Sequence, residues 1–197
     1  RLDRKVAIKS LPPDLASNPD RLARFDREAR TLASLHHPNV ASILGVEEAD
    51  GQRFLILEYV EGETLQDALA RGPVPTDDAL RLASRIASGV QAAHDAGVIH
   101  RDLKPANVRV TAEHQPKILD FGIAKPAEAS TATSSSIVPT ASFPQTAEGA
   151  IIGTVHYMSP EQARGKPLDK RTDVWSFGVL LFEMLTGHSP FVGETTT

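Results

Sequence analysis

The chain has 197 residues, 41% of them apolar and 23% charged, an ordinary globular composition with enough length for one domain or for a domain of two lobes. A formal charge of −4 excludes a strongly basic nucleic-acid surface, and no apolar run is long enough to cross a bilayer or opens the chain as a signal peptide. The absence of cysteine excludes a disulfide scaffold and thiol chemistry, and it fits a cytoplasmic protein.

The N-terminal part of the chain predicts a strand followed by a helix. Residues 5–10 alternate enough to form a strand. Asn18 and Pro19 then suit the N-cap and first turn of a helix. The residues expected on its buried stripe are Leu22, Phe25, Ala29, Leu32 and Leu35. Glu28 lies at the edge of this stripe, and a carboxylate that faces a core needs a partner.

Two further strands and two helices are expected before the middle of the chain. The apolar runs 40–46 and 53–60, separated by a turn at 50–51, predict a pair of strands. A short helix is expected from its cap at Thr64 to near Gly72, and a longer one over 76–97. Both helices are interpreted as scaffold.

Residues 99–122 carry the groups that suggest chemistry. Asp102, Asn107 and Asp120 offer oxygen ligands of the kind that Mg²⁺ shares with substrate phosphates. A loop carboxylate beside them could orient an attacking hydroxyl or accept its proton. Taken singly, each Asp is more simply a turn former or helix cap, and His100 is more simply a packing residue. The joint pattern, which includes Lys104, favours a phosphoryl-transfer site.

At this point the sequence resembles the eukaryotic-type (Hanks-type) protein kinases. His-Arg-Asp-Leu-Lys-Pro-Ala-Asn at 100–107 is similar to their catalytic loop, and Asp-Phe-Gly at 120–122 to their metal-binding signature. Val-Ala-Ile-Lys at 6–9 matches their third strand, and residues 158–165 look most like bacterial serine/threonine kinases. The resemblance covers essentially the whole chain.

The resemblance implies an α+β, two-lobed, protein-kinase-like fold that is truncated at both ends. A partial N-lobe over 1–60 and a partial C-lobe over 61–197 are expected. The glycine-rich loop that should precede Lys9 is missing, and so are the helices that should follow Phe191. We therefore expect this fragment alone to be poorly active and marginally stable.

The implied activity is transfer of the γ-phosphoryl group of ATP to a protein Ser or Thr hydroxyl, with Mg²⁺ or Mn²⁺. In the family, Asp102 would orient the nucleophile and accept its proton, while Lys104 would steady the γ-phosphate. Asn107 and Asp120 would bind the metal. Lys104 also favours Ser/Thr over Tyr specificity.

The residues that the resemblance assigns to the nucleotide are Ala7, Lys9, Glu28, Leu57, Glu58, Val60 and Arg109. Lys9, paired with Glu28, would hold the phosphates, and Leu57 would be the gatekeeper. Backbone groups of residues 58 and 60 would meet the adenine edge. Arg109 departs from the family, which places an aliphatic residue beneath the adenine. Either its alkyl stem supplies that floor while the guanidinium reaches solvent, or nucleotide affinity is weaker.

Residues 126–150 are the most unusual stretch, with nine Ser or Thr among 25 residues and only two charges. This composition predicts a mobile loop, and the resemblance implies an activation segment. Arg101 would meet a phosphorylated residue of this segment. The candidate sites, in order of preference, are Thr146, Ser142 and Thr140. An unmodified, tolerated insertion is an equally open alternative.

Three residues near the end of the chain are given structural roles by the resemblance. Thr154 matches a threonine that contacts the catalytic loop. Glu161 belongs to a Ser-Pro-Glu that stands for the family's Ala-Pro-Glu. Because the helices that carry its arginine partner in the family are missing, it is expected to have no partner here. Asp173 opens an apolar helix expected to be buried all round, and it would anchor the catalytic-loop backbone.

Two other classes of function compete with the kinase interpretation. One is a pseudokinase-like interaction or scaffold module whose Ser/Thr-rich loop is phosphorylated. The other is a generic nucleotide-binding fold without transferase activity, for which no glycine motif is present. The kinase interpretation implies protein substrates and self-association for autophosphorylation. It involves no nucleic acid and no membrane segment within this chain, although a tether elsewhere in the full-length protein would be compatible with it.

Overall fold

A computed structural model describes residues 4–12, 18–123 and 155–191. The sites predicted at Thr140, Ser142, Thr146 and Thr154 lie outside these residues. The elements are β1 (Val6–Ser10), α2 (Pro19–Ser34), β2 (Ile43–Ala49), β3 (Gln52–Glu58), β4 (Glu63–Thr64), α3 (Leu65–Leu69), α4 (Thr76–Asp95), η1 (Pro105–Asn107), β5 (Val108–Val110), β6 (Pro116–Ile118), α6 (Pro160–Ala163) and α7 (Arg171–Thr186).

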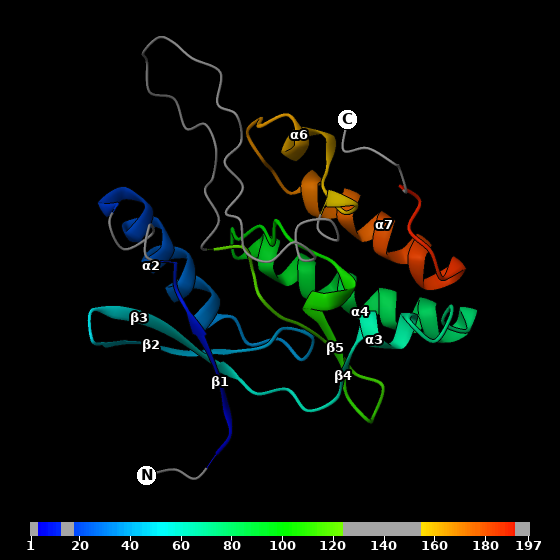
Figure 1. Ribbon diagram of the computed structural model, residues 1–197, viewed down its shortest axis with the longest axis horizontal. Coiled ribbons are helices and arrows are strands. Elements are labelled where there is room, and N and C mark those ends of the chain that lie inside the picture. Colours follow the sequence, from blue (N-terminus) through cyan, green and yellow to red (C-terminus); the bar gives the residue numbers. More distant parts are fainter. Residues whose placement is uncertain (1–3, 13–17, 124–154, 192–197) are drawn as a thin grey trace.

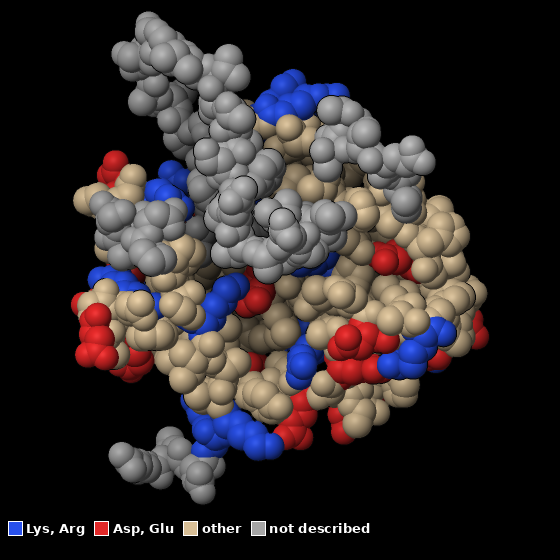
Figure 2. All heavy atoms as spheres, in the orientation of Figure 1, with Lys and Arg blue, Asp and Glu red and all other residues tan. Residues whose placement is uncertain are grey.

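The strands form two small antiparallel sheets, ordered β1-β3-β2 and β4-β5-β6. Figure 1 shows α2 beside the first sheet on one side of the molecule, while α3, α4 and α7 lie together on the other side with the second sheet. Figure 2 shows acidic and basic side chains interspersed on one face, without a large basic surface. None of the described helices is both long enough and apolar enough to cross a membrane.

Helix α2 follows the local signals in its sequence. The Asn18 side chain accepts a hydrogen bond from the Arg21 N–H at 3.1 Å, which satisfies one of the free donors at the helix start. Phe25, Ala29 and Leu32 are buried at helical spacing. The predicted cap and the centre of the predicted stripe are therefore confirmed.

The junction between the two sheets explains why one strand begins later than expected. The run 40–46 was expected to be extended throughout, but β2 starts at Ile43. Residues before it bond instead to β6: the Ile118 N–H donates to the Asn39 carbonyl at 2.9 Å, and the Ala41 N–H donates to the Ile118 carbonyl at 2.9 Å. This segment therefore joins the end of α2 to the second sheet.

Helix α7 differs from the prediction that it is buried all round. Its buried residues are Thr172, Asp173, Ser176, Val179, Leu180 and Met184, a set that includes polar residues. Helix α4 packs against α7, but the rest of the surface of α7 is covered only in part. Phe191 stacks on Trp175 with ring centroids 5.4 Å apart, whereas Val174 remains 64% exposed.

Gly62 allows the chain to turn closely past β5 after β3. Its φ is +130°, and an added Cβ would lie 2.2 Å from the Val110 carbonyl oxygen. We expect Gly62→Ala to lower the free energy of unfolding by at least about 1–3 kcal/mol, the usual range for a strained backbone position. Urea unfolding measures this change.

Gly45 provides the matched control for that substitution. It lies in β2, and an added Cβ would meet nothing within 4 Å. Gly45→Ala should change the free energy of unfolding by no more than about 0.5 kcal/mol. Equal stability of the two variants would contradict the role given to Gly62.

Candidate active site

A cleft of about 400 Å³ opens between the first sheet and the β5–β6 hairpin. Of the seven residues assigned to the nucleotide, six line this cleft: Ala7, Lys9, Leu57, Glu58, Val60 and Arg109. Asp120 joins them from the end of the segment after β6, whereas Glu28 is not among the lining residues. The structure therefore brings together residues of β1, of the segment 58–60 at the end of β3 (the hinge) and of the Asp-Phe-Gly motif, which are far apart in sequence.

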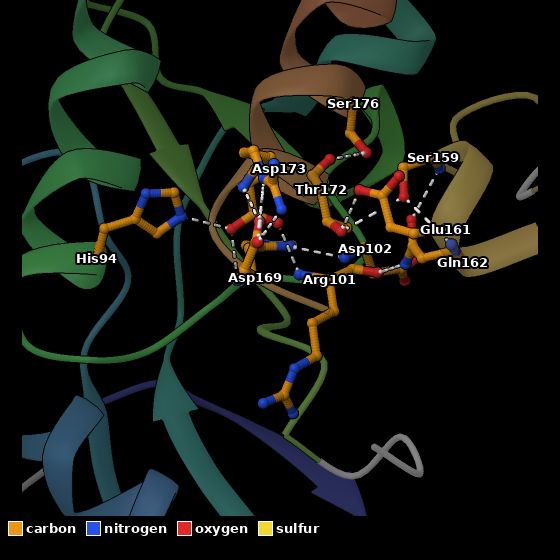
Figure 3. Close-up of polar contacts among 12 residues, drawn as sticks. His94, Arg101, Asp102, Ser159, Glu161, Gln162, Asp169, Thr172, Asp173 and Ser176 are labelled. Carbon is orange, nitrogen blue, oxygen red and sulfur yellow. Dashed lines mark hydrogen bonds and ion pairs between the residues drawn. The ribbon is translucent and has the colours of Figure 1, made fainter. Parts of the chain in front are cut away.

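The backbone of the loop at 100–101 is held by the carboxylate of Asp173, which is completely buried. Figure 3 shows this carboxylate beside Arg101. Oδ2 accepts the His100 N–H at 2.7 Å, and Oδ1 accepts the Arg101 N–H at 2.8 Å. His94 Nε2 lies 2.7 Å from Oδ2. A buried carboxylate is stable only with such donors, so the interaction expected between Asp173 and the loop backbone is present.

The His100 ring connects the two kinase-like motifs. It is completely buried and packs on Phe121 with centroids 4.5 Å apart. The Asp102 N–H donates to its Nδ1 at 3.2 Å, so the proton is on Nε2, which donates to the Leu119 carbonyl at 2.9 Å. The ring is therefore neutral, in agreement with the packing role expected for it.

Two polar side chains of the catalytic loop, Asn107 and Lys104, contact Asp102. Asn107 Nδ2 donates to the Asp102 carbonyl at 2.9 Å and to its Oδ2 at 3.1 Å. Lys104 Nζ lies 3.3 Å from the same Oδ2. Because Asp102 takes up the amide nitrogen, the amide oxygen of Asn107 is the atom left to bind a cation.

The predicted ion pair between Lys9 and Glu28 is wrong for this structure. Lys9 Nζ lies 3.1 Å from Asp120 Oδ1, and the Glu28 carboxylate accepts both terminal nitrogens of Arg101, at 3.0 and 3.2 Å. The physical reason is that a guanidinium binds a carboxylate through two parallel hydrogen bonds, which an ammonium cannot do. Arg101 and Glu28 side chains are only 12% and 15% exposed.

Two non-glycine residues of the site have a left-handed backbone. Arg101 has a φ of 64° and Asp120 a φ of 53°. Such conformations are disfavoured for residues with a Cβ and persist where the surroundings impose them. At Arg101 these surroundings are the N–H bond to Asp173 and a bond of 2.8 Å from the Gln162 side chain to the Arg101 carbonyl (Figure 3).

Gln162 and Glu161 show what the sequence interpretation missed near α6. Ser159 and Gln162 form a reciprocal capping box, a pattern that was visible as Ser-x-x-Gln in the sequence. Glu161 was expected to lack a partner, but its Oε1 accepts the Thr172 hydroxyl at 2.8 Å. That expectation was wrong because the neighbouring start of α7 supplies a donor.

Arg109 also contacts the protein in a way that was not predicted. Its Nη1 donates to the Val60 carbonyl at 2.9 Å, so the guanidinium binds the segment after β3 instead of simply reaching solvent. On the opposite strand, Lys117 Nζ lies 2.6 Å from Glu58 Oε1. Lys117 was missed because only the β5–β6 register places it there.

Removing an oxygen of Asp173 should destabilise the protein. In Asp173→Asn one backbone donor would face an amide NH₂ in place of a carboxylate oxygen, and a buried donor without an acceptor costs about 1–3 kcal/mol. We expect a loss of that size in urea unfolding. Asp169→Asn is the control, because Asp169 pairs with Arg171 at an exposed position and should change stability far less. Equal effects of the two substitutions would contradict the anchoring role.

The ion pair of Glu58 predicts a pH dependence. Burial alone would raise the pKa of Glu58, but hydrogen bonds from Lys117 and from the Ser42 N–H outweigh it and hold the pKa below the ordinary 4.5. A carboxylate whose pKa is lowered by folding stabilises the protein at pH values above its unfolded-state pKa. This contribution is lost as the pH falls through the folded-state pKa. The stability advantage of wild type over Lys117→Met should therefore be full near neutral pH and shrink below 4.5.

Unfolding of both proteins by urea between about pH 3 and pH 7 measures this difference. Lys5→Met is the control, since its pair with Glu61 is exposed and should contribute little at any pH. A stability difference for Lys117→Met that stays constant over this range would contradict the assignment.

Comparisons with known proteins agree with this geometry. The family model described as "Protein kinase domain" matches residues 1–197. The chain is 40% identical over 200 residues to serine/threonine-protein kinase PknB of Mycobacterium leprae, covering 99% of this chain and 30% of that protein. It is 42% identical over 195 residues to PrkC of Bacillus subtilis, covering 98% of this chain and 28% of that protein.

A solved structure is also similar. The crystal structure of a point mutant of the PknI kinase domain of Mycobacterium tuberculosis matches with a TM-score of 0.70 and 26% identity, over 95% of this chain and 66% of that one. The α+β kinase-like fold predicted from the sequence is thereby confirmed. The chain spans less than a third of the length of both curated relatives. It belongs to the protein kinase domain family, with relatives among the bacterial serine/threonine kinases.

Proposed function

We propose that this chain carries the catalytic centre of a serine/threonine protein kinase, which transfers the γ-phosphoryl group of ATP to protein hydroxyls. The observation that supports it best is the pair of Lys9 and Asp120, 3.1 Å apart in the cleft beside the catalytic loop. The Leu119 N–H donates to the Asn107 carbonyl at 2.8 Å, which holds the metal-signature segment against that loop.

The donor set fits Mg²⁺ or Mn²⁺. The Asp120 side chain is 38% exposed. The amide nitrogen of Asn107 contacts Asp102, which leaves the amide oxygen to bind a cation, so two hard oxygen ligands are available. Bound with ATP, the metal would neutralise charge on the phosphates. Lys9 is 44% exposed at its side chain and would exchange Asp120 for phosphate oxygens.

The catalytic loop would supply the remaining chemistry. Asp102 would orient the substrate hydroxyl and accept its proton, while Asn107 and Lys104 hold that carboxylate in place. Lys104 would also steady the transferred phosphate. The Ala7 and Leu57 side chains would line the base site, next to the backbone of residues 58–60.

Regulation is proposed to act through Arg101. A phosphorylated Thr146, Ser142 or Thr140 would compete with Glu28 for its guanidinium, because a phosphate offers more charge and more acceptor oxygens than a carboxylate. Release of Glu28 would leave its carboxylate free to pair with Lys9. These three sites, and the contact expected of Thr154, lie outside the described residues and stay predictions.

The broader assignments are proposals of the same kind. The division into an N-lobe over 1–60 and a C-lobe over 61–197 follows the hinge at the end of β3. Protein substrates, a second copy of the chain as an autophosphorylation partner, and a cytoplasmic location follow from the proposed activity. A pseudokinase role is disfavoured because Lys9, Asp102, Asn107 and Asp120 are all present.

Substitutions in the full-length protein test the proposal. Asp120→Asn and Lys9→Met should abolish most phosphoryl transfer to a protein substrate, because each removes a contact to the metal or the phosphates. Asp102→Asn should lower the rate by roughly 10²–10⁴-fold, the range for a positioned acid–base group. Transfer of radiolabelled phosphate measures all three.

Asp78→Asn is the matched control, since Asp78 pairs with Arg81 on the exposed side of α4. Its activity should equal that of wild type, and circular dichroism should show that every variant is folded. Full activity in all three cleft variants would exclude the kinase assignment.

A further inference from the structure

The register of the β5–β6 hairpin places two cations opposite each other. Arg109 pairs with Lys117 in this antiparallel ladder. Directly opposed residues share one face of a sheet, and like charges in this position destabilise the pair. The arrangement is therefore stable only where each cation has an acceptor of its own.

Both acceptors come from the three-residue hinge 58–60. Lys117 Nζ lies 2.6 Å from the Glu58 carboxylate, which also accepts the Ser42 N–H at 3.0 Å. Arg109 Nη1 donates to the Val60 carbonyl at 2.9 Å. The hinge is thus held from one side by two basic side chains of β5 and β6.

These contacts leave the two main-chain groups of Val60 in different states. Its carbonyl already accepts a hydrogen bond from Arg109, whereas its N–H has no acceptor within the described part of the chain. Arg109 and Val60 both line the cleft. A ligand that enters the cleft therefore meets the Val60 N–H, which is available to donate, beside the Val60 carbonyl, which already accepts from Arg109.

We propose that Arg109 is a specificity-determining residue that makes the cleft select purines with an unsubstituted C2 edge. This inference rests on the proposed function, in which the backbone of the hinge binds a purine base. If Val60 N–H donates to N1 of the base, one of the two neighbouring positions, C2 or C6, faces the Val60 carbonyl.

The chemistry of the base then decides the selectivity. Adenine has one amino group, at C6, and can turn its C2–H edge toward the occupied carbonyl. A 2,6-diaminopurine has a donor on both sides of N1 and must bring one of them beside the guanidinium. The Val60 carbonyl oxygen has a second lone pair. An amino group of the base that donated to it would, however, lie against the Arg109 guanidinium, which can only donate and cannot accept a hydrogen bond.

The test compares ATP with 2,6-diaminopurine riboside triphosphate in the protein at its natural length, using dissociation constants from isothermal titration calorimetry. In wild type the added 2-amino group should weaken binding. In Arg109→Leu the Val60 carbonyl is free, so the 2-amino nucleotide should bind about two- to tenfold more tightly than ATP, the effect of one net hydrogen bond.

Arg85→Leu is the matched control. Arg85 makes the same kind of contact, from Nη1 to the His114 carbonyl at 2.9 Å, but it lies on α4 and is not among the residues that line the cleft. This variant should keep the wild-type ratio of the two dissociation constants. Arg109→Lys retains a cationic donor and should keep the ratio closer to wild type than Arg109→Leu does.

The outcomes separate this inference from the proposed function. If neither nucleotide binds wild type, the proposed function fails and this inference fails with it. If both bind and Arg109→Leu leaves their ratio unchanged, only the inference is overturned. The wild-type measurement is decisive even where Arg109→Leu does not fold. Equal or tighter binding of the 2-amino nucleotide to wild type would by itself contradict the proposal, and weaker binding would support it.

Discussion

The structure depends on one buried carboxylate that organises a loop more than 70 residues away in sequence. Asp173 accepts two consecutive main-chain N–H groups, from His100 and Arg101, and also contacts His94. Each bond compensates part of the desolvation of the carboxylate. Because the two N–H groups converge on one side chain, the loop backbone has little freedom, and Arg101 adopts its left-handed conformation.

Once this backbone is fixed, Arg101 connects three helices. Its N–H binds Asp173 of α7, its carbonyl accepts the side chain of Gln162 in α6, and its guanidinium binds Glu28 of α2. Its Nε is buried without a hydrogen-bond partner among the described residues. One hydrogen-bond donor of the buried guanidinium is therefore unused, as expected for a residue that can exchange one partner for another.

The sequence predicted features that depend on neighbouring residues and failed on those that depend on distant ones. The cap of α2 and its buried centre follow from local spacing, so they were predictable. The partner of Glu28 was not, because Arg101 is 73 residues away in sequence and the contact depends on how α2 is placed relative to the loop. Likewise, the sequence marked Arg109 as unusual, but only the position of the hinge shows that its guanidinium binds Val60.

The proposed function requires that Asp120 and Asn107 hold a nucleotide-bound metal at this cleft. A crystal structure of the protein with Mn²⁺ and a non-hydrolysable ATP analogue tests it directly, because manganese can be located by its anomalous scattering. We expect one metal bound by the Asp120 carboxylate and the Asn107 amide oxygen, with Lys9 moved from Asp120 to the phosphates. A nucleotide bound outside the cleft, or a metal that contacts neither residue, would contradict it.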